Sequence, residues 1–382
     1  MSFSTYLYIY PNLFSLNVFC ILCYNKSMIY FDYAATSLFR EEIFEYIFKH
    51  LGDFDGNTES THAYGRSSRK ILEEARTDIG KSINADPAFI YFNSGASEGN
   101  NTILKSFKAN EILTTNIEHS SIQNNIDEKT QIVKVDQSGI FNLEDIVEKI
   151  SEDTKLISVQ YVNNELGTIQ PVEKLGAWLA DNRPDIWFHV DAVQAYGHLD
   201  IDVQKIKCTS LAISAHKLGA SKNFGILYAK RAFAPLIKAG DQEHGLRGGT
   251  GNTIGAYSCA RAYEYMVKDR AYIKSLKEYF LEKISKSNIN YQVNGDLNSQ
   301  TDHILNIYFK DFDTDFLLTY LDMHGICVSS GSACKSGSHL PSHVITNTYD
   351  EDRAEHSIRF SFGYKNTFED IDKLMKVLGD IK

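Results

Sequence analysis

A glycine- and serine-rich turn follows an apolar run at residues 90–101, IYFNSGASEGNN. Its small residues, Ala96 and Ser97 among them, would let the backbone approach a ligand closely. The helix expected to begin there would present free N–H groups and the positive end of its dipole, which favours phosphate binding. An ordinary helix with a serine cap is the alternative interpretation.

Two later apolar runs end in charged side chains. Asp191 closes IWFHVD, with Gln194 three residues on, and Lys217 follows SLAISA, with Ser214 and His216 beside it. A buried carboxylate needs a cationic partner, such as the ring nitrogen of pyridoxal phosphate, whose phenolic oxygen Gln194 could then reach. A lysine in a cleft can lose its proton through desolvation and form a Schiff base. A structural aspartate and a solvated loop lysine are the alternatives.

A cysteine and an arginine complete the set of candidate residues. Cys334 lies in VSSGSACKSGSHLPSH (328–343), which is too rich in glycine and serine for a regular element, so we expect a mobile loop that suits a travelling thiolate. The nearby Lys335 and His339 would favour the thiolate form of Cys334. The alternative interpretation of Cys334 is a buried structural cysteine. Arg359 alternates with apolar neighbours in SIRFSFG and should bind an anion, either a substrate carboxylate or a structural ion-pair partner.

Composition narrows the class of protein. The 382 residues carry a formal net charge of -10, which argues against a nucleic-acid-binding surface. The six cysteines are sparse and scattered, which favours a reducing compartment and hence the cytoplasm. Residues 1–27 are poor as a signal peptide and too interrupted for a membrane span, so we expect an extension outside the catalytic fold and no membrane partner.

Strand-length apolar runs alternate with amphipathic helical patterns over roughly residues 60–255, which predicts an α/β fold with a mainly parallel sheet covered on both faces. Ligands of such sheets bind beyond the carboxyl ends of the strands. A long helix at 256–287 and a mixture of strands and helices follow, which indicates a smaller α+β domain. We expect the large domain at 46–264 and the small domain at 28–45 and 265–382. The main expected strands are 89–92, 155–162, 186–192, 210–215, 303–309 and 357–363, and the main expected helices are 67–83, 143–150 and 171–182.

The phosphate cup, the carboxylate and the lysine occur in an order that resembles a known family. From about Met28 to the C-terminus, the chain is similar to the cysteine desulfurases of the class V aminotransferase group, which are fold-type I pyridoxal-phosphate enzymes. The motifs that carry the resemblance are FDYAAT, GNTESTHAYGR, SGASEGNN, IEHSSI, VNNELGTIQP, HVDAVQ, SAHK, RGGT, SSGSAC and SIRFSFG.

The resemblance implies a role for each matching residue. Lys217 would form the Schiff base, His119 would stack on the ring and shuttle a proton, and Cys334 would receive the sulfur. Arg359 would bind the substrate carboxylate. The remaining implied cofactor contacts are Ala96, Ser97, Ser214 and His216 at the phosphate, Asp191 at the ring nitrogen, Gln194 at the phenolic oxygen, Asn164 on the substrate side, and Thr250 at the phosphate of a neighbouring subunit.

The implied reaction removes sulfur from L-cysteine, leaving L-alanine and a persulfide on Cys334. Implied partners are a second copy of the chain and a sulfur acceptor or iron–sulfur scaffold, with Cys334 as a shared cluster ligand. A selenocysteine lyase or another class V lyase is the alternative enzyme, and a non-catalytic scaffold is the alternative class. The sequence departs from the family pattern at Ala220 and Asn223, after the lysine, and at Ala239 and Asp241.

Overall fold

The computed structural model describes residues 28–331 and 341–381. Its largest sheet has seven strands in the order β2-β8-β7-β6-β5-β3-β4. The strands from β7 to β4 are parallel, whereas β8 runs antiparallel to both of its neighbours. The prediction of a mainly parallel sheet is therefore confirmed. The strands are β2 (Ile90–Asn93), β3 (Ile112–Thr115), β4 (Gln131–Val133), β5 (Leu156–Gln160), β6 (Trp187–Asp191), β7 (Ser210–Ser214) and β8 (Gly225–Ala229).

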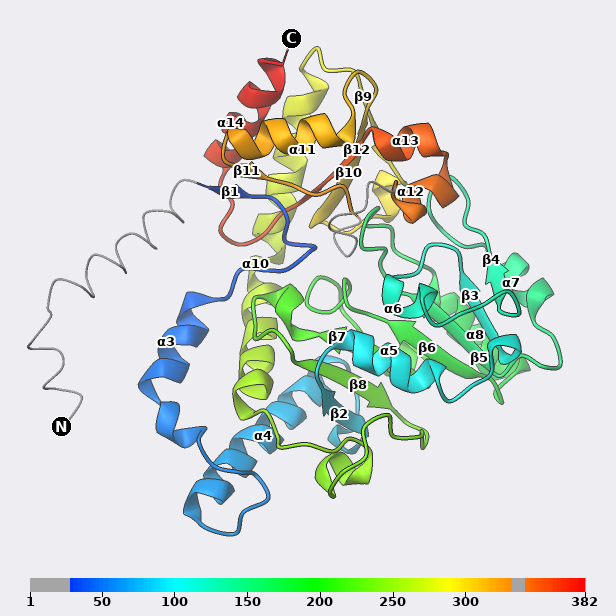
Figure 1. Ribbon diagram of the computed structural model, residues 1–382, viewed down its shortest axis with the longest axis vertical. Helices are drawn as coiled ribbons and strands as arrows, with labels where there is room; N and C mark the ends of the chain where they lie inside the picture. Colours follow the sequence, from blue (N-terminus) through cyan, green and yellow to red (C-terminus); the bar gives the residue numbers. More distant parts are fainter. Residues whose placement is uncertain (1–27, 332–340, 382) are drawn as a thin grey trace, which may run out of the picture.

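Every residue of the central strands β5, β6, β7 and β8 is buried, because helices lie over both faces of the sheet (Figure 1). Several helices are preceded by an N-cap residue whose side chain accepts a hydrogen bond from a backbone N–H of the first turn. His62 caps α4 in this way, and Asn142 caps α7. The helices of this part are α3 (Glu41–Lys49), α4 (Ala63–Ser82), α5 (Ala96–Leu104), α6 (Ser120–Gln123), α7 (Leu143–Lys149), α8 (Val172–Asn182) and α9 (Val203–Ile206).

Two small sheets form the other end of the molecule. One has the order β12-β10-β9 and is antiparallel, and the other pairs β1 with β11 in parallel. The elements are β1 (Ile29–Tyr30), β9 (Tyr291–Asn294), β10 (Ile304–Phe309), β11 (Ile326–Cys327), β12 (Ser357–Ser361), α11 (Thr314–Met323), α12 (His343–Thr348), α13 (Glu351–Glu355) and α14 (Phe368–Gly379).

Helix α10 (Thr253–Ser285) joins the two ends, since it packs against α4 at one end and α14 at the other (Figure 1). Both predicted domain boundaries fall inside helices: residue 45 lies in α3 and residue 264 lies in α10. The division of the chain at these residues therefore stays a prediction.

The segment from residue 31 to residue 40 also connects the two ends. The N–H of Ser361 donates to the carbonyl of Phe31, and the N–H of Ser37 donates to the carbonyl of His216. This segment thus runs from β12 to the turn that follows β7, and it brings its backbone carbonyls to the carboxyl edge of the large sheet.

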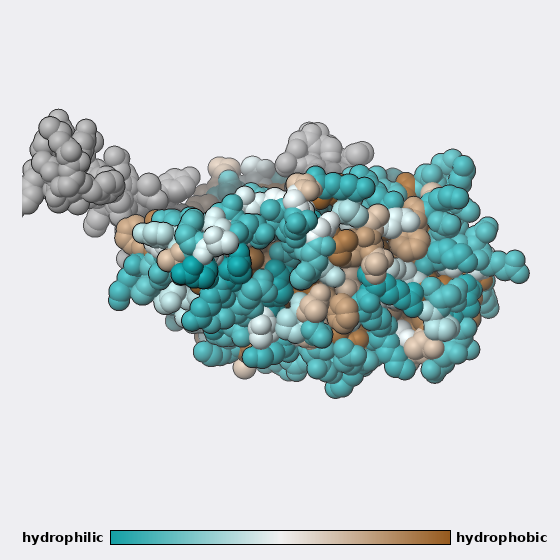
Figure 2. Space-filling model, turned by 90° about the horizontal axis from the view of Figure 1, so that it is seen from below, coloured by the Kyte–Doolittle hydropathy of each residue, from teal (hydrophilic) through white to brown (hydrophobic). Residues whose placement is uncertain are grey.

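The face in Figure 2 is mostly hydrophilic, with small apolar areas between hydrophilic side chains. In the described part of the chain, no helix is both long enough and apolar enough to cross a membrane.

Candidate active site

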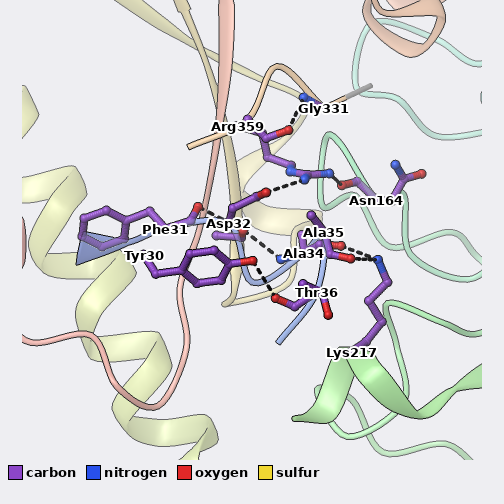
Figure 3. A network of polar contacts seen from close by, with 12 residues as sticks. Tyr30, Phe31, Asp32, Ala34, Ala35, Thr36, Asn164, Lys217, Gly331 and Arg359 are labelled. Atoms are coloured by element: carbon purple, nitrogen blue, oxygen red, sulfur yellow. Dashed lines mark hydrogen bonds and ion pairs between the residues drawn. The ribbon is translucent and has the colours of Figure 1, made fainter. Parts of the chain in front are cut away.

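Lys217 lies in a short 3-10 turn, Ala215–Leu218, directly after β7. Its Nζ donates to the carbonyl of Ala34 at 2.6 Å and to that of Ala35 at 2.8 Å (Figure 3). The turn ends at Gly219, where φ is +81° and a Cβ would lie 2.6 Å from the carbonyl oxygen of Leu38. Glycine is therefore required at this position, and the amine is held at the strand end against the segment from residue 31 to residue 40.

Asp191 closes β6, the parallel neighbour of β7, so its carboxylate lies at the same edge of the sheet as the lysine turn. Its Oδ2 accepts from Asn100 Nδ2 at 2.8 Å, and its Oδ1 accepts from the N–H of Val193 at 3.1 Å. The second N–H of Asn100 donates to Ser121 Oγ at 2.8 Å. Asn100, which is fully buried on α5, therefore links the carboxylate to the start of α6.

His119 is the N-cap of α6, and its Nδ1 accepts the backbone N–H of Ser121 at 3.1 Å. Ser121 Oγ lies 2.9 Å from the same nitrogen. Because Nδ1 accepts a hydrogen bond, the proton of a neutral His119 ring must be on Nε2. The geometry thus fixes which nitrogen of His119 can donate a proton.

A buried chain of hydrogen bonds orients Asn100 from beneath. Trp187 Nε1 donates to Ser210 Oγ at 2.7 Å, and Ser210 Oγ lies 2.8 Å from His189 Nδ1. His189 Nε2 lies 2.9 Å from Asn100 Oδ1 and must donate to it, because an amide oxygen only accepts. Burial lowers the pKa of His189 to about 3, so the ring is neutral and this direction is maintained near pH 7.

The predicted phosphate cup lies at the start of α5, where Ala96 and Ser97 are the first two helical residues after Gly95. Strand β8 passes directly beneath this turn, because a Cβ at Gly225 would lie 2.4 Å from Gly95 Cα. Ser214 is buried, and its Oγ lies 3.8 Å from the position of a Cβ at Gly95. The structure therefore brings these predicted phosphate contacts together.

His216 directly precedes Lys217 in the turn after β7. Its Nδ1 is 3.1 Å from Thr36 Oγ1. Burial, with contributions from the nearby charges of Lys217, Lys222 and His119, lowers the pKa of His216 to about 3. His216 is therefore a neutral hydrogen-bonding group near pH 7.

Arg359 and Asn164 meet on the other side of the site (Figure 3). Arg359 is 1% exposed; its Nη1 donates to the carbonyl of Asn164 at 2.8 Å and its Nη2 pairs with Asp32 Oδ1 at 2.8 Å. Within the described residues, Arg359 Nε and Asn164 Oδ1 are buried without a hydrogen-bond partner. Asp32 supplies the structural ion pair that the sequence allowed as an alternative, while the unpaired Nε keeps a donor for a further anion.

Residues 29–374 match the family described as Aminotransferase class-V. The putative cysteine desulfurase IscS 1 of Bacillus subtilis (strain 168) is 37% identical over 373 residues, which cover 92% of this chain and 98% of that protein. The chain belongs to the cysteine desulfurase family. A solved NifS-like protein superposes with a TM-score of 0.84 at 30% identity, covering 92% of this chain and 98% of the other. SspA in complex with cysteine superposes with a TM-score of 0.76 at 30% identity, covering 87% and 98%.

The structure does not test the roles of two predicted site residues of this desulfurase. Thr250 is exposed before α10, and its predicted contact with a neighbouring subunit stays a prediction. Cys334 lies outside the described residues, as do Lys335 and His339, so its roles as sulfur acceptor and cluster ligand also stay predictions. Among the described residues, no group of three or more histidine, cysteine, aspartate or glutamate side chains could hold a metal ion.

The residue types alone did not single out several polar groups of the site. Asn100 and His189 occur in the quoted motifs SGASEGNN and HVDAVQ. Both are polar residues at buried positions of regular elements, and this is the signal that could have identified them. Asp32, in FDYAAT, can be recognised as a residue of the site only from its ion pair with Arg359. Ala34 contributes only its backbone carbonyl, which no residue pattern reveals.

Glu165 is a further buried carboxyl at the site. Burial raises its pKa, while a hydrogen bond from Ser342 Oγ and the nearby charges of His343, Arg359 and His119 act in the opposite direction. Glu165 therefore lies near both the predicted proton shuttle and the substrate-side arginine.

The departures from the family pattern are accommodated locally. Asn223 has φ of +56°, a backbone conformation that asparagine adopts more readily than most residues. Asparagine can therefore replace the family's glycine at this position. Ala239 packs against Gly248, where a Cβ would lie 2.3 Å from the Ala239 side chain. Asp241 is exposed.

Proposed function

We propose that this chain is a pyridoxal-phosphate-dependent cysteine desulfurase that converts L-cysteine to L-alanine and transfers the sulfur to Cys334. One observation carries the proposal: the amine of Lys217 and the carboxylate of Asp191 lie at the ends of adjacent parallel strands, in a chain of the desulfurase family. This edge is where open parallel sheets bind ligands.

The donor set fits that cofactor. An amine, a buried carboxylate, an imidazole and a helix N-terminus match the aldehyde, the ring nitrogen, the ring face and the phosphate in turn. Pyridoxal phosphate, when bound, supplies the aldehyde that captures the substrate amine and a ring that takes up the electron pair of the Cα–H bond. Lys217 and Asp191 would hold its two reactive ends, and Ala96 and Ser97 its phosphate.

The remaining residues have roles that follow from their geometry. Arg359 Nε and Asn164 Oδ1 would face the substrate, with Nε donating to its α-carboxylate. Lys217 would accept the Cα proton, and His119 Nε2, whose proton the Ser121 contact fixes, would donate or return a proton.

The sulfur step involves Cys334. Its thiolate would attack the substrate sulfur, so that an S–S bond forms while the C–S bond breaks and its electron pair stays with the carbon skeleton. Protonation of that skeleton gives alanine. We further propose that two copies assemble, with Thr250 reaching the phosphate of the neighbouring site. The enzyme would act in the cytoplasm, and the persulfide would pass to an acceptor such as an iron–sulfur scaffold.

The test compares three variants with the wild type for bound-cofactor absorbance and for alanine and sulfide formed from L-cysteine. Lys217→Ala should lose the visible absorbance, and Cys334→Ser should keep it but form no persulfide. Cys327→Ser is the matched control, because Cys327 is a half-buried free thiol in β11 and should keep full turnover. Sulfide release that persists in Cys334→Ser, or colour that survives in Lys217→Ala, would contradict the proposal. A Cys334→Ser enzyme that still consumes selenocysteine would favour a selenocysteine lyase.

A further inference from the structure

Two histidines, His198 and His303, lie at the oxygen end of the Gln194 amide. His303 stands in the turn before β10, and His198 follows Gly197 in the turn after β6. Their rings are stacked, with centroids 3.4 Å apart and planes inclined by 8°. His303 Nε2 lies 3.2 Å from Gln194 Oε1. The two ends of the molecule thus meet at the amide of Gln194.

The hydrogen bonds of Gln194 define which way its amide points. Its Nε2 donates at 2.9 Å to the carbonyl of Ala34, the same oxygen that accepts from Lys217 Nζ at 2.6 Å. The NH₂ end therefore faces the lysine and the oxygen end faces His303. Because that oxygen only accepts, His303 Nε2 must carry the proton.

The other nitrogen of His303 is an unusual feature. His303 is 1% exposed, and in the described part of the chain its Nδ1 has no hydrogen-bond partner. A buried nitrogen without a partner is costly, so an apolar ring would be preferred if this position only filled space. Burial, with His198, Lys277, Arg359 and Lys217 nearby, lowers the pKa of His303 well below its ordinary value, so the ring stays neutral.

A reversed amide would have two defects. Gln194 Oε1 would face the carbonyl oxygen of Ala34, and it would present an acceptor to the region beside Lys217. We propose that His303 is a positioning residue that holds the Gln194 amide with its second N–H directed into the site, toward the phenolic oxygen of the cofactor. This inference rests on the proposed function.

The consequence is measurable in the colour of the holoenzyme. An N–H donor stabilises negative charge on the phenolic oxygen, and that charge attracts the proton on the nitrogen joining Lys217 to the cofactor. When the phenolic oxygen loses the donor, its charge holds this proton more strongly. The pH midpoint of the absorbance change should therefore rise, by about one pH unit for one lost charge-assisted hydrogen bond.

The experiment uses two matched variants of the holoenzyme. His303→Phe keeps the stacked ring but removes the donor to Gln194, whereas His198→Phe keeps both the stack and the donor. The midpoint should rise in His303→Phe and stay at the wild-type value in His198→Phe. Gln194→Ala should shift it in the same direction, and adding His303→Phe to Gln194→Ala should cause no further change.

Three results would overturn the inference: an unchanged midpoint in His303→Phe, equal shifts in the two phenylalanine variants, or additive shifts in the double variant. If His303→Phe does not fold or load cofactor, the comparison uses His303→Ala, which should shift the midpoint, and His303→Gln, whose amide can donate and should restore it. Failure of the wild type to bind pyridoxal phosphate at Lys217 would instead refute the proposed function.

Discussion

Glu118 offers a test of how burial controls charge beside the proposed proton shuttle. This side chain is fully buried, and its Oε1 accepts from Thr115 Oγ1 at 2.6 Å and from the N–H of Gln160 at 3.2 Å. In the described part of the chain its Oε2 has no partner. Burial, with the charge of Asp191 acting in the same direction, raises the pKa of Glu118 from 4.5 to about 8.

The raised pKa makes stability depend on pH. Between pH 4.5 and about 8 the folded chain keeps the Glu118 proton while the unfolded chain loses it, so the contribution to stability falls as pH rises. At about 1.4 kcal/mol per pH unit, the loss over this window is on the order of 4–5 kcal/mol. Glu118→Gln is isosteric with the protonated side chain and does not titrate. Relative to the wild type, it should therefore gain stability by this amount as pH rises from 4.5 to 8.

Urea unfolding at several pH values measures this difference directly. Glu128→Gln, at an exposed glutamate, is the control and should show a difference from the wild type that changes little with pH. A difference between Glu118→Gln and the wild type that stays constant across the window would refute the reasoning, as would one that becomes less favourable to the variant at high pH.

Three other substitutions test the site and the packing beneath it. Asn100→Ala removes a buried side chain with three hydrogen bonds, so the free energy of unfolding should fall by about 2–4 kcal/mol in urea titrations, and the pH profile of turnover should change because His119 loses its alignment. Arg359→Lys cannot reproduce the two-sided guanidinium contacts, so the KM for L-cysteine should rise by roughly tenfold or more with the cofactor absorbance unchanged. Gly176→Ala places a Cβ 1.8 Å from the carbonyl oxygen of Ile206, so a thermal melt should show destabilisation by about 1–3 kcal/mol or more.

The sequence predicted the parts of the fold that depend on local pattern. Strand and helix positions were close to those observed; the run 186–192, for example, contains β6 (Trp187–Asp191). The shared edge of Asp191 and Lys217 followed from parallel strand order, which is a general property of such sheets.

Other parts of the site arise from packing between distant segments and could not be predicted. The carbonyls of Ala34 and Ala35 reach Lys217 across more than 180 residues of sequence, and alanine side chains give no sign of this. One of the stacked histidines follows β6 of the large sheet, and the other precedes β10 of a small sheet. Such contacts depend on how the elements pack, which periodicity and propensity do not encode.

Packing also determines which side chains of the site are neutral and which elements carry its acidic and basic groups. Burial holds His189 and His216 neutral, with the pKa of each lowered to about 3, so neither ring adds charge to the site. Among the described residues, Asp191, Lys217 and Arg359 are acidic and basic side chains of the site. Asp191 and Lys217 come from the large sheet, whereas Arg359 comes from β12 in the small one. The segment around residues 31–36 contacts both sides, since its acidic residue pairs with the arginine and its carbonyls bind the lysine (Figure 3). A shift of this segment would therefore disturb the contacts of both the amine and the arginine without altering either strand, which makes its backbone as important to the site as the charged residues themselves.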